Sequence, residues 1–209
     1  MTPVAWPGLA TRLEGRLVVV EPLTRAHAEG LRLAAADAAV WRWMTVSAHE
    51  PEGFERWLEA TLAAAEEGAE VPFAIVLRAS GEPVGSTRYL TLRPEHRGLE
   101  IGWTWHARSA WGTGVNVEAK LLLLAHAFET LGCMRVEFKT DARNERSRAA
   151  LAALPARFEG IFLKHMLVRE GELRDSAYYA ITDDEWPAVR ANLERRVAAA
   201  LEGAVQAGD

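Results

Sequence analysis

The segment 100–119 constrains the fold of this chain more than any other part of the sequence. Apolar residues alternate with other residues from Ile101 to Trp105, which is the pattern of a half-buried β-strand. Gly112 and Gly114 then form a turn, and a long apolar helix follows. Glycines let the backbone come close to a ligand, and the free N–H groups of a helix start attract anions. The segment therefore predicts a strand, a glycine turn and a helix that could hold a phosphate.

Two familiar phosphate loops also place glycines before a helix, and the sequence excludes both. A P-loop needs Lys and then Ser or Thr directly after its last glycine, whereas Lys120 lies between Ala119 and Leu121. The Rossmann fingerprint needs a third glycine where Val117 stands. The turn thus belongs to another class of loop.

The turn resembles the acyl-CoA loop of the GCN5-related N-acetyltransferases (GNATs), whose pattern is Arg/Gln-x-x-Gly-x-Gly/Ala. Gly112 and Gly114 match this pattern. Ser109 occupies the Arg/Gln position, and Arg108 lies one residue early. An ordinary tight strand-to-helix connection would also explain two glycines here.

The resemblance extends over roughly residues 15 to 190. The matching segments follow the order seen in the GNAT branch that acetylates ribosomal-protein N-termini at alanine or serine. They are 100–103, 116–132, 135–140, 144–147, 159–160, 174–175 and 185–186. The resemblance implies the mixed α/β GNAT fold, in which helices flank a central, mostly antiparallel, twisted sheet of about seven strands.

Length and composition favour a single domain spanning residues 1–209. A chain of 209 residues with 49% hydrophobic residues can bury a substantial core. Net charge −5 argues against nucleic-acid or anionic-membrane binding. One cysteine, Cys133, excludes an internal disulfide, and the N-terminus lacks a signal-peptide pattern, so we expect a cytoplasmic protein. Residues 1–15 are expected to form a loose arm, and 203–209 a frayed tail.

Periodicity and capping residues predict the elements along the chain. Helices are expected at 24–36, 51–68, 116–131 and 145–154, and another is expected after the capping box of Thr182 and Glu185. Strands are expected at 16–23, 71–78, 84–92, from about 100, and at 135–140, 157–168 and 175–181. The alternation in the second half predicts a parallel crossover within a mixed sheet.

The resemblance implies an enzyme that transfers an acetyl group directly from acetyl-CoA to a primary amine. The implied acceptor is a protein or peptide N-terminal α-amine. A small-molecule amine, such as an amino acid, polyamine or aminoglycoside, remains an alternative, as does a non-catalytic acyl-CoA-binding module. No metal is expected, and a homodimer is implied at the family level.

The same resemblance implies the residues that hold acetyl-CoA. Pantetheine would add to the free edge of the strand near Gly102, which is expected to be a bulge residue. An ordinary strand glycine against a bulky neighbour is the alternative. The implied cofactor-binding residues are Ile101, Gly102, Trp103, Thr104, Gly112, Thr113, Gly114, Val115, Asn116, Asn144 and Arg148.

Two residues are candidates for the general base. An α-amine with a pKa near 8 needs about 1 kcal/mol to be neutral at pH 7, whereas a lysine needs roughly 4.6 kcal/mol, so a weak base suffices for α-amines. Glu100 matches the family position beside the thioester. Strand alternation would place Glu100, Gly102, Thr104 and His106 on one face, which makes His106 the second candidate.

The remaining candidates serve the leaving group, the phosphate and the acceptor. By resemblance, Ser147 assists the thiolate, although Asn144 and Ser147 also fit an ordinary helix cap. Arg143, Arg146 and Arg148 could reach the 3′-phosphate or form a solvated helix face. Trp43 is expected to line the acceptor pocket. Trp41 and His126 are expected in the core.

Overall fold

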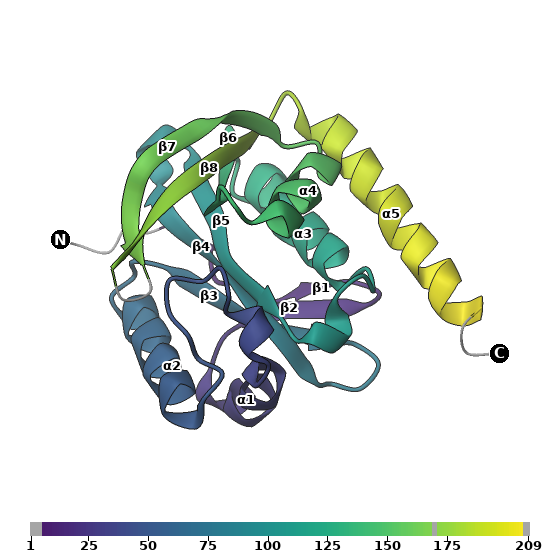
Figure 1. Ribbon diagram of the computed structural model, residues 1–209. Coiled ribbons are helices and arrows are strands. Elements are labelled where there is room, and N and C mark those ends of the chain that lie inside the picture. Colours follow the sequence, from purple (N-terminus) through teal and green to yellow (C-terminus); the bar gives the residue numbers. More distant parts are fainter. Residues whose placement is uncertain (1–5, 169–170, 207–209) are drawn as a thin grey trace.

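An eight-stranded mixed sheet forms the centre of the molecule, with the order β1-β2-β3-β4-β5-β6-β8-β7 (Figure 1). The computed structural model describes residues 6–168 and 171–206. All neighbouring strands are antiparallel except β5 and β6. The strands are β1 (Leu13–Glu14), β2 (Val18–Pro22), β3 (Val71–Leu77), β4 (Pro83–Arg93), β5 (Gly98–His106), β6 (Arg135–Asp141), β7 (Arg157–Val168) and β8 (Glu172–Thr182).

Helices cover both faces of this sheet. The helices α1 and α2 lie on one side, whereas α3 packs against β2 and α5 on the other (Figure 1). The α-helices are α1 (Ala28–Ala35), α2 (Pro51–Glu66), α3 (Val115–Ala125), α4 (Glu145–Ala153) and α5 (Trp186–Gln206). Short 3₁₀ turns occupy Arg25–His27, Ala38–Val40, Pro94–His96 and Arg108–Ala110, and a π turn, His126–Thr130, extends α3.

The ends of these helices follow from local chemistry. Thr24 caps the turn before α1 in a reciprocal capping box with His27. Pro51 begins α2 at the helix position where a missing N–H costs nothing. Just before α5, Glu185 accepts hydrogen bonds from the backbone N–H and the hydroxyl of Thr182, which is one half of the predicted capping box. The N–H of Glu185 donates to the carbonyl oxygen of Thr182 in place of its hydroxyl.

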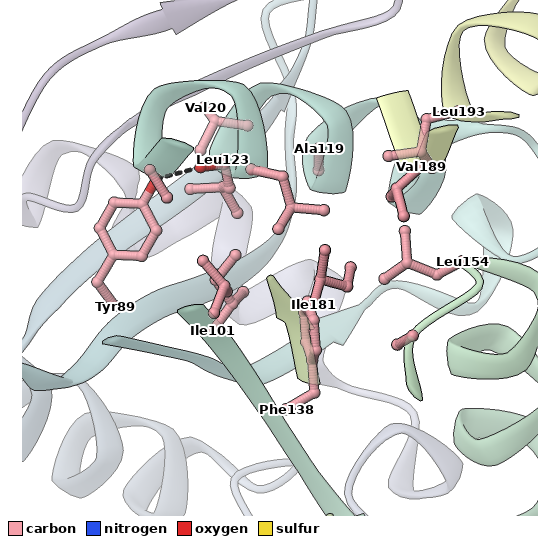
Figure 2. Packing of buried hydrophobic residues seen from close by; sticks show 14 of the residues in the cluster. Val20, Tyr89, Ile101, Ala119, Leu123, Phe138, Leu154, Ile181, Val189 and Leu193 are labelled. Carbon is pink, nitrogen blue, oxygen red and sulfur yellow. Dashed lines mark hydrogen bonds between the residues drawn. The ribbon is translucent and has the colours of Figure 1, made fainter. Parts of the chain in front are cut away.

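The main core lies between the sheet and the pair of α3 and α5. Apolar side chains from β2, β4, β5, β6 and β8 meet those of the two helices there (Figure 2). The hydroxyl of Tyr89 donates to the carbonyl oxygen of Leu123 at 2.7 Å, which satisfies a buried phenol (Figure 2). His126 lies 3.2 Å from the same hydroxyl, in the core as expected.

A second core lies under α1 and α2 and is rich in tryptophan. The rings of Trp41, Trp57 and Trp105 contact one another with centroids 5.1 to 5.9 Å apart. Trp41 also donates from its ring nitrogen to the carbonyl oxygen of Ala35. This confirms the expected core role of Trp41 and fixes the segment between α1 and α2.

Several boundaries differ from the sequence expectation. The expected loose arm is wrong for its described part, because Leu9 is buried, Trp6 packs on the main core, and β1 joins the sheet as an eighth strand. The helix α5 continues through Gln206, so the expected fraying from residue 203 does not occur there, and residues 207–209 lie outside the described part.

A buried carboxylate ties the start of the chain to α3. Glu118 accepts hydrogen bonds from the backbone N–H groups of Arg16, Leu17 and Val18 at 2.6 to 2.8 Å. This contact holds the turn between β1 and β2 against the helix that follows the glycine turn. Among the described residues, the structure contains no helix long and apolar enough to cross a membrane.

Candidate active site

The strands β5 and β6 separate in the middle of the sheet. They pair in parallel only from Gly98 to Glu100 on β5, opposite Arg135 to Glu137 on β6. In the described part of the chain, β5 has no further pair with β6, and the later residues of β6 pair only with β8. One edge of β5 is thus free directly after Glu100, as the resemblance predicts.

A bulge accompanies the separation, and it lies one residue later than expected. Gly102 pairs with Arg88 and Trp105 with Ser86, so Trp103 and Thr104 both lie opposite Thr87. Trp103 carries a positive φ of 50°, which is rare for a side chain of its size. Gly102 is adjacent to the bulge, and a Cβ there would approach the Glu100 carboxylate to 3.0 Å.

The bulge makes the expected alternation of side chains wrong. Glu100 and Gly102 face the side of α1 and α2, and Trp103 and Trp105 pack on the tryptophan-rich core of that same side. Thr104 instead contacts α3, and His106 follows it on that side. Because two residues share one position of the partner strand, the pattern shifts by one. Glu100 and His106 therefore lie on opposite faces.

The glycine turn brings the start of α3 to the end of β5. Gly112 has a φ of 79° and open space where a side chain would be, and Gly114 caps α3 with a φ of 87°. A Cβ on Gly114 would lie 2.5 Å from that of Ala200 in α5, so this glycine also permits helix packing. The side chain of Thr113 donates to the carbonyl oxygen of Ala110, and Val115 is buried. The first backbone N–H groups of α3 have no carbonyl partner within the helix, so they can bind a ligand.

A cavity of about 510 Å³ crosses the sheet where β5 and β6 separate. We call its side at Gly112, Gly114 and Asn116 the loop end, and its side at Glu100 and Lys139 the carboxylate end. The sequence-predicted residues that line it are Trp43, Glu100, Ile101, Gly102, Trp103, Thr104, His106, Gly112, Gly114, Asn116, Asn144 and Ser147. The structure therefore gathers most of the predicted site around one cavity.

Glu100 occupies a junction between two cavities. It lines the sheet-crossing cavity and also a neighbouring one of about 340 Å³ between β4, β6, β7 and β8. The residue is 3% exposed, and its Oε2 lies 3.3 Å from both Lys139 Nζ and Thr91 Oγ1. Burial raises the pKa of Glu100, while the Lys139 ammonium opposes that rise. A carboxylate with a raised pKa is a suitable proton acceptor near neutral pH.

His106 is placed poorly for base catalysis. Its ring is buried, and burial together with the charges of Lys120 and Arg146 lowers its pKa to about 3. A group that binds a proton so weakly is a poor acceptor for the proton of the incoming ammonium. His106 also lies on the opposite face of β5 from Glu100, which likewise argues against it as the base. The second candidate for the base is therefore disfavoured.

Asn144 and Ser147 form the helix cap at the start of α4. The Asn144 side-chain oxygen accepts from the backbone N–H of Ser147 at 3.1 Å. The cap uses only the backbone of Ser147, and both residues line the cavity. The capping alternative is confirmed, and it leaves the Ser147 hydroxyl available for a ligand.

The structure separates the three arginines around α4. Arg148, expected to bind the cofactor, turns away from the cavity and donates to the Tyr179 hydroxyl and the Ala142 carbonyl. Arg143 pairs with the carboxylates of Asp141 and Glu172. The hydrogen bonds of Arg148 to Tyr179 and Ala142 fix its guanidinium on β8 and on the loop before α4, so they take the place of the expected phosphate contact.

Arg146 faces the loop end of the cavity. Its guanidinium stacks on the Trp111 ring at 3.5 Å, directly before Gly112, and it lines the cavity. Burial, with the nearby charge of Arg108, lowers the pKa of Arg146. This arginine supplies positive charge beside a turn in which Ser109 replaces the usual Arg or Gln. Arg146 and Arg148 are two residues apart on α4, so the sequence already indicates that they point to different sides of the helix.

Aromatic and basic residues from several elements also line the cavity. Trp43 is half-buried, lines the cavity, and lies between the guanidiniums of Arg42 and Arg143 at 5.2 and 5.4 Å. Lys139 and Lys120 also line the cavity, and the sequence reasoning missed both as site residues. Lys120 had a signal, since it interrupts the apolar face of α3, whereas Lys139 follows ordinary strand alternation.

Comparison with known proteins assigns the family. The sequence profile described as "Acetyltransferase (GNAT) domain" matches residues 16–156. A candidate acetyltransferase from T. thermophilus is 40% identical, with a TM-score of 0.80 over 88% of this chain and 96% of that one. A GCN5-related N-acetyltransferase from Brucella melitensis is 29% identical, with a TM-score of 0.85 over 94% of this chain and 89% of that one.

A further similar structure contains a ligand of the expected class. Mycobacterium smegmatis RimJ in complex with CoA-disulfide is 28% identical, with a TM-score of 0.73 over 93% of this chain and 95% of that one. No curated protein matches the chain in a sequence search. The profile match spans more than half of the chain and agrees with the separated strands and the glycine turn. The chain therefore belongs to the GNAT family and is an acetyl-CoA-dependent N-acetyltransferase.

Proposed function

We propose that the acceptor is the α-amine of a protein or peptide N-terminus, and that Glu100 takes its proton. The observation that carries this proposal is the position of Glu100 at the junction of the two cavities, beside the free edge of β5. An acetyl donor reaching through the sheet and an amine entering from the other face would meet there. An α-amine needs only about 1 kcal/mol to lose its proton at pH 7, which a single buried carboxylate can supply.

The expected chemistry is a direct transfer. Glu100 accepts a proton from the ammonium, and the neutral amine nitrogen then attacks the thioester carbonyl carbon. The carbon–sulfur bond breaks, and the proton that the nitrogen releases on forming the amide goes to the departing sulfur. The Ser147 hydroxyl, on the first turn of α4, donates a hydrogen bond to the departing thiolate. Both residues line the same cavity, which supports these roles.

At the loop end, the residues fit the phosphates of acetyl-CoA. Backbone N–H groups of the turn and of the first turn of α3 lack partners within the helix and favour an anion. The Arg146 guanidinium adds positive charge on the other side of Trp111. Pantetheine would then follow the free edge of β5 toward Glu100 and add to the sheet like a strand.

The charges around the smaller cavity disfavour a polycationic acceptor. Its three carboxylates all have basic partners: Glu137 with Arg93 and Arg135, Glu159 with Arg135, and Glu100 with Lys139. A polyamine or aminoglycoside would need carboxylates free to pair with it. A single amine at the end of a peptide makes no such demand, and the Trp43 ring suits a short apolar side chain. The similarity to RimJ is further support.

A panel of acceptors tests the proposal. We expect acetyl-CoA turnover with peptides that begin with Ala or Ser, and none with the same peptides blocked at the N-terminus but carrying an internal lysine. Spermidine and an aminoglycoside serve as the small-molecule arm. Turnover that is faster with either of these than with every free peptide would contradict the proposed acceptor.

A further inference from the structure

Lys120 is an unusual residue for the position that it occupies. It lies on the second turn of α3 and faces the sheet, is 8% exposed, and lines the sheet-crossing cavity. Lysine is rarely buried without a charged partner, because removing an ammonium from water is costly. In the part of the chain that the structure describes, no carboxylate lies within ion-pair distance of it.

The ammonium has more donors than the protein satisfies. It carries three N–H groups, and the hydrogen bond found among the described residues is to Thr104 Oγ1 at 2.9 Å. Phe138 on β6 presents its ring at 5.6 Å from the nitrogen. Burial lowers the pKa of Lys120 to about 7, as expected for a cation with so little compensation.

A second polar group in the same cavity also lacks a partner. The Nε2 atom of His106 is buried, and the described residues give it no hydrogen bond. His106 follows Thr104 by two residues and lies close enough for the Lys120 charge to affect its pKa. Two neighbouring buried groups with unused hydrogen-bonding capacity point to a polar ligand in the cavity.

The position along β5 selects which part of a ligand lies there. Glu100 and the glycine turn mark the two ends of the cavity, and Thr104 lies between them. At ~3.3 Å per residue, Thr104 lies up to about 13 Å along the strand from Glu100. The two ends of the pantetheine arm of an acyl-CoA, namely its thioester and the diphosphate attached to it, would occupy the carboxylate end and the loop end. The middle of its pantetheine arm, which carries two amide carbonyls, would lie over Thr104 and Lys120.

We infer that Lys120 is a binding residue for acyl-CoA and donates a hydrogen bond to an amide carbonyl oxygen of the pantetheine arm. This inference rests on the proposed placement of the donor along β5. It adds a side-chain contact from beneath the strand edge to the backbone contacts that such an edge can offer. It also explains why α3 keeps a lysine where its neighbours are leucines and alanines.

The variant Lys120→Met tests the contact, since methionine has similar length and no donor. We expect the affinity for CoA to fall about tenfold, as for the loss of one hydrogen bond to a charged group. Affinity for adenosine 3′,5′-bisphosphate, which has no pantetheine, should stay within about twofold of the wild type. Lys164→Met, an exposed lysine on β7, is the matched control and should leave both affinities unchanged.

Thermal stability separates a binding role from a structural one. Replacing an uncompensated buried ammonium with an apolar side chain should raise the melting temperature of the free protein. Binding and stability would then move in opposite directions, whereas the loss of a structural contact would lower both. A lower melting temperature together with unchanged CoA affinity would overturn the inference.

Proton uptake gives an independent readout. The titratable or charged groups that share the cavity with Lys120 are His106 on β5, Arg146 on α4, Arg174 on β8, Arg196 on α5, and Glu100 with Lys139 across the sheet. At pH 8, a new carbonyl acceptor should draw a proton onto Lys120 when CoA binds. Calorimetry in two buffers of different ionisation enthalpy should show this uptake in the wild type and lose it in Lys120→Met.

The possible failures are distinguishable. If the wild-type protein does not bind CoA, the proposed function itself is wrong. If the wild type binds CoA and Lys120→Met binds it equally well, only the role of Lys120 is wrong. An equal loss for CoA and adenosine 3′,5′-bisphosphate would also overturn it, because the lysine would then act at the phosphates or on the shape of the cavity.

Discussion

The loop end of the cavity is built mainly from backbone, whereas the carboxylate end is built from side chains that come from distant parts of the chain. Gly112, Gly114 and the first turn of α3 are contiguous in sequence, and local conformation leaves N–H groups of this turn without partners inside the helix. Glu100 and Lys139 are 39 residues apart and meet only because β5 and β6 pair briefly and then separate.

This difference indicates which part of the site changes its properties when the sequence changes. Backbone N–H groups do not depend on the side chains around them, so the loop end can hold the same donor in many sequences. A buried carboxylate depends on every neighbouring charge, so its proton affinity and the acceptor it serves change with single substitutions. We therefore expect the choice of acceptor to be decided at the carboxylate end.

The largest expected effect is at that end. Glu100→Gln keeps the shape and removes the base, so kcat/KM near pH 7 should fall by about 10² to 10⁴-fold with a free peptide. The loss should shrink as the pH approaches the pKa of the amine, where solvent supplies neutral acceptor. Profiles of kcat/KM against pH measure this, with His106→Gln beside it, which should show no comparable pH-sensitive loss because the pKa of His106 is about 3.

Stability provides the control for Glu100→Gln. Burial raises the pKa of Glu100 in the folded state, so its ionised form opposes folding at a pH above the unfolded value. Glutamine carries no charge and should not lower the melting temperature at pH 7 to 8. A melting temperature well below that of the wild type would show that the activity loss reports misfolding, and the base assignment would lose its support.

Lys139 should adjust the pKa of Glu100 without affecting the binding of phosphates at the loop end. Its ammonium lies 3.3 Å from Glu100 and opposes the rise in the Glu100 pKa. Lys139→Met should therefore raise that pKa further and move the acidic limb of kcat/KM to higher pH. We expect a loss of up to about tenfold at the lowest pH assayed, with recovery at alkaline pH. A loss of equal size at every pH would contradict this tuning role.

A pair of arginines on α4 sharpens the comparison at the loop end. Arg146→Gln should weaken acetyl-CoA binding by about tenfold, because a charge-assisted hydrogen bond to phosphate is lost, and should leave the melting temperature unchanged. Arg148→Gln should lower the melting temperature and leave acetyl-CoA affinity unchanged. Its guanidinium binds Tyr179 and the Ala142 carbonyl and does not line the cavity. Titration calorimetry and thermal melts on both variants check this. Equal affinities in the two variants would remove Arg146 from the site.

The smallest expected effect is at Ser147. Alanine retains the backbone N–H that Asn144 caps, so Ser147→Ala should keep α4 and its stability intact. Turnover should fall by several-fold and by more than the Michaelis constant for acetyl-CoA rises, because a hydrogen bond to the thiolate strengthens in the transition state. Turnover within about twofold of the wild type would restrict Ser147 to its place in the cap.

Local patterns were enough to locate the loop end and the elements other than β1, which lies in the segment expected to be a loose arm. The glycine turn, the capping residues Thr24 and Thr182, and the apolar periodicity gave the order of helices and strands to within a few residues. Such signals act over one turn of helix or one strand pair, so they are readable without knowledge of the rest of the chain. The resemblance to GNATs drew on these same segments, which is why the family was predictable.

The carboxylate end depended on contacts that the sequence does not display. One extra residue at Trp103 shifted the alternation of β5 and placed Glu100 and His106 on opposite faces of the sheet. No local signal marks that shift, because the bulge is fixed by pairing with β4. Arg148 is hydrogen-bonded to Tyr179 on β8, and Lys139 on β6 and Lys120 on α3 both line the cavity. Burial and proximity set the charge states of these groups, and both quantities exist only after the strands and helices have packed.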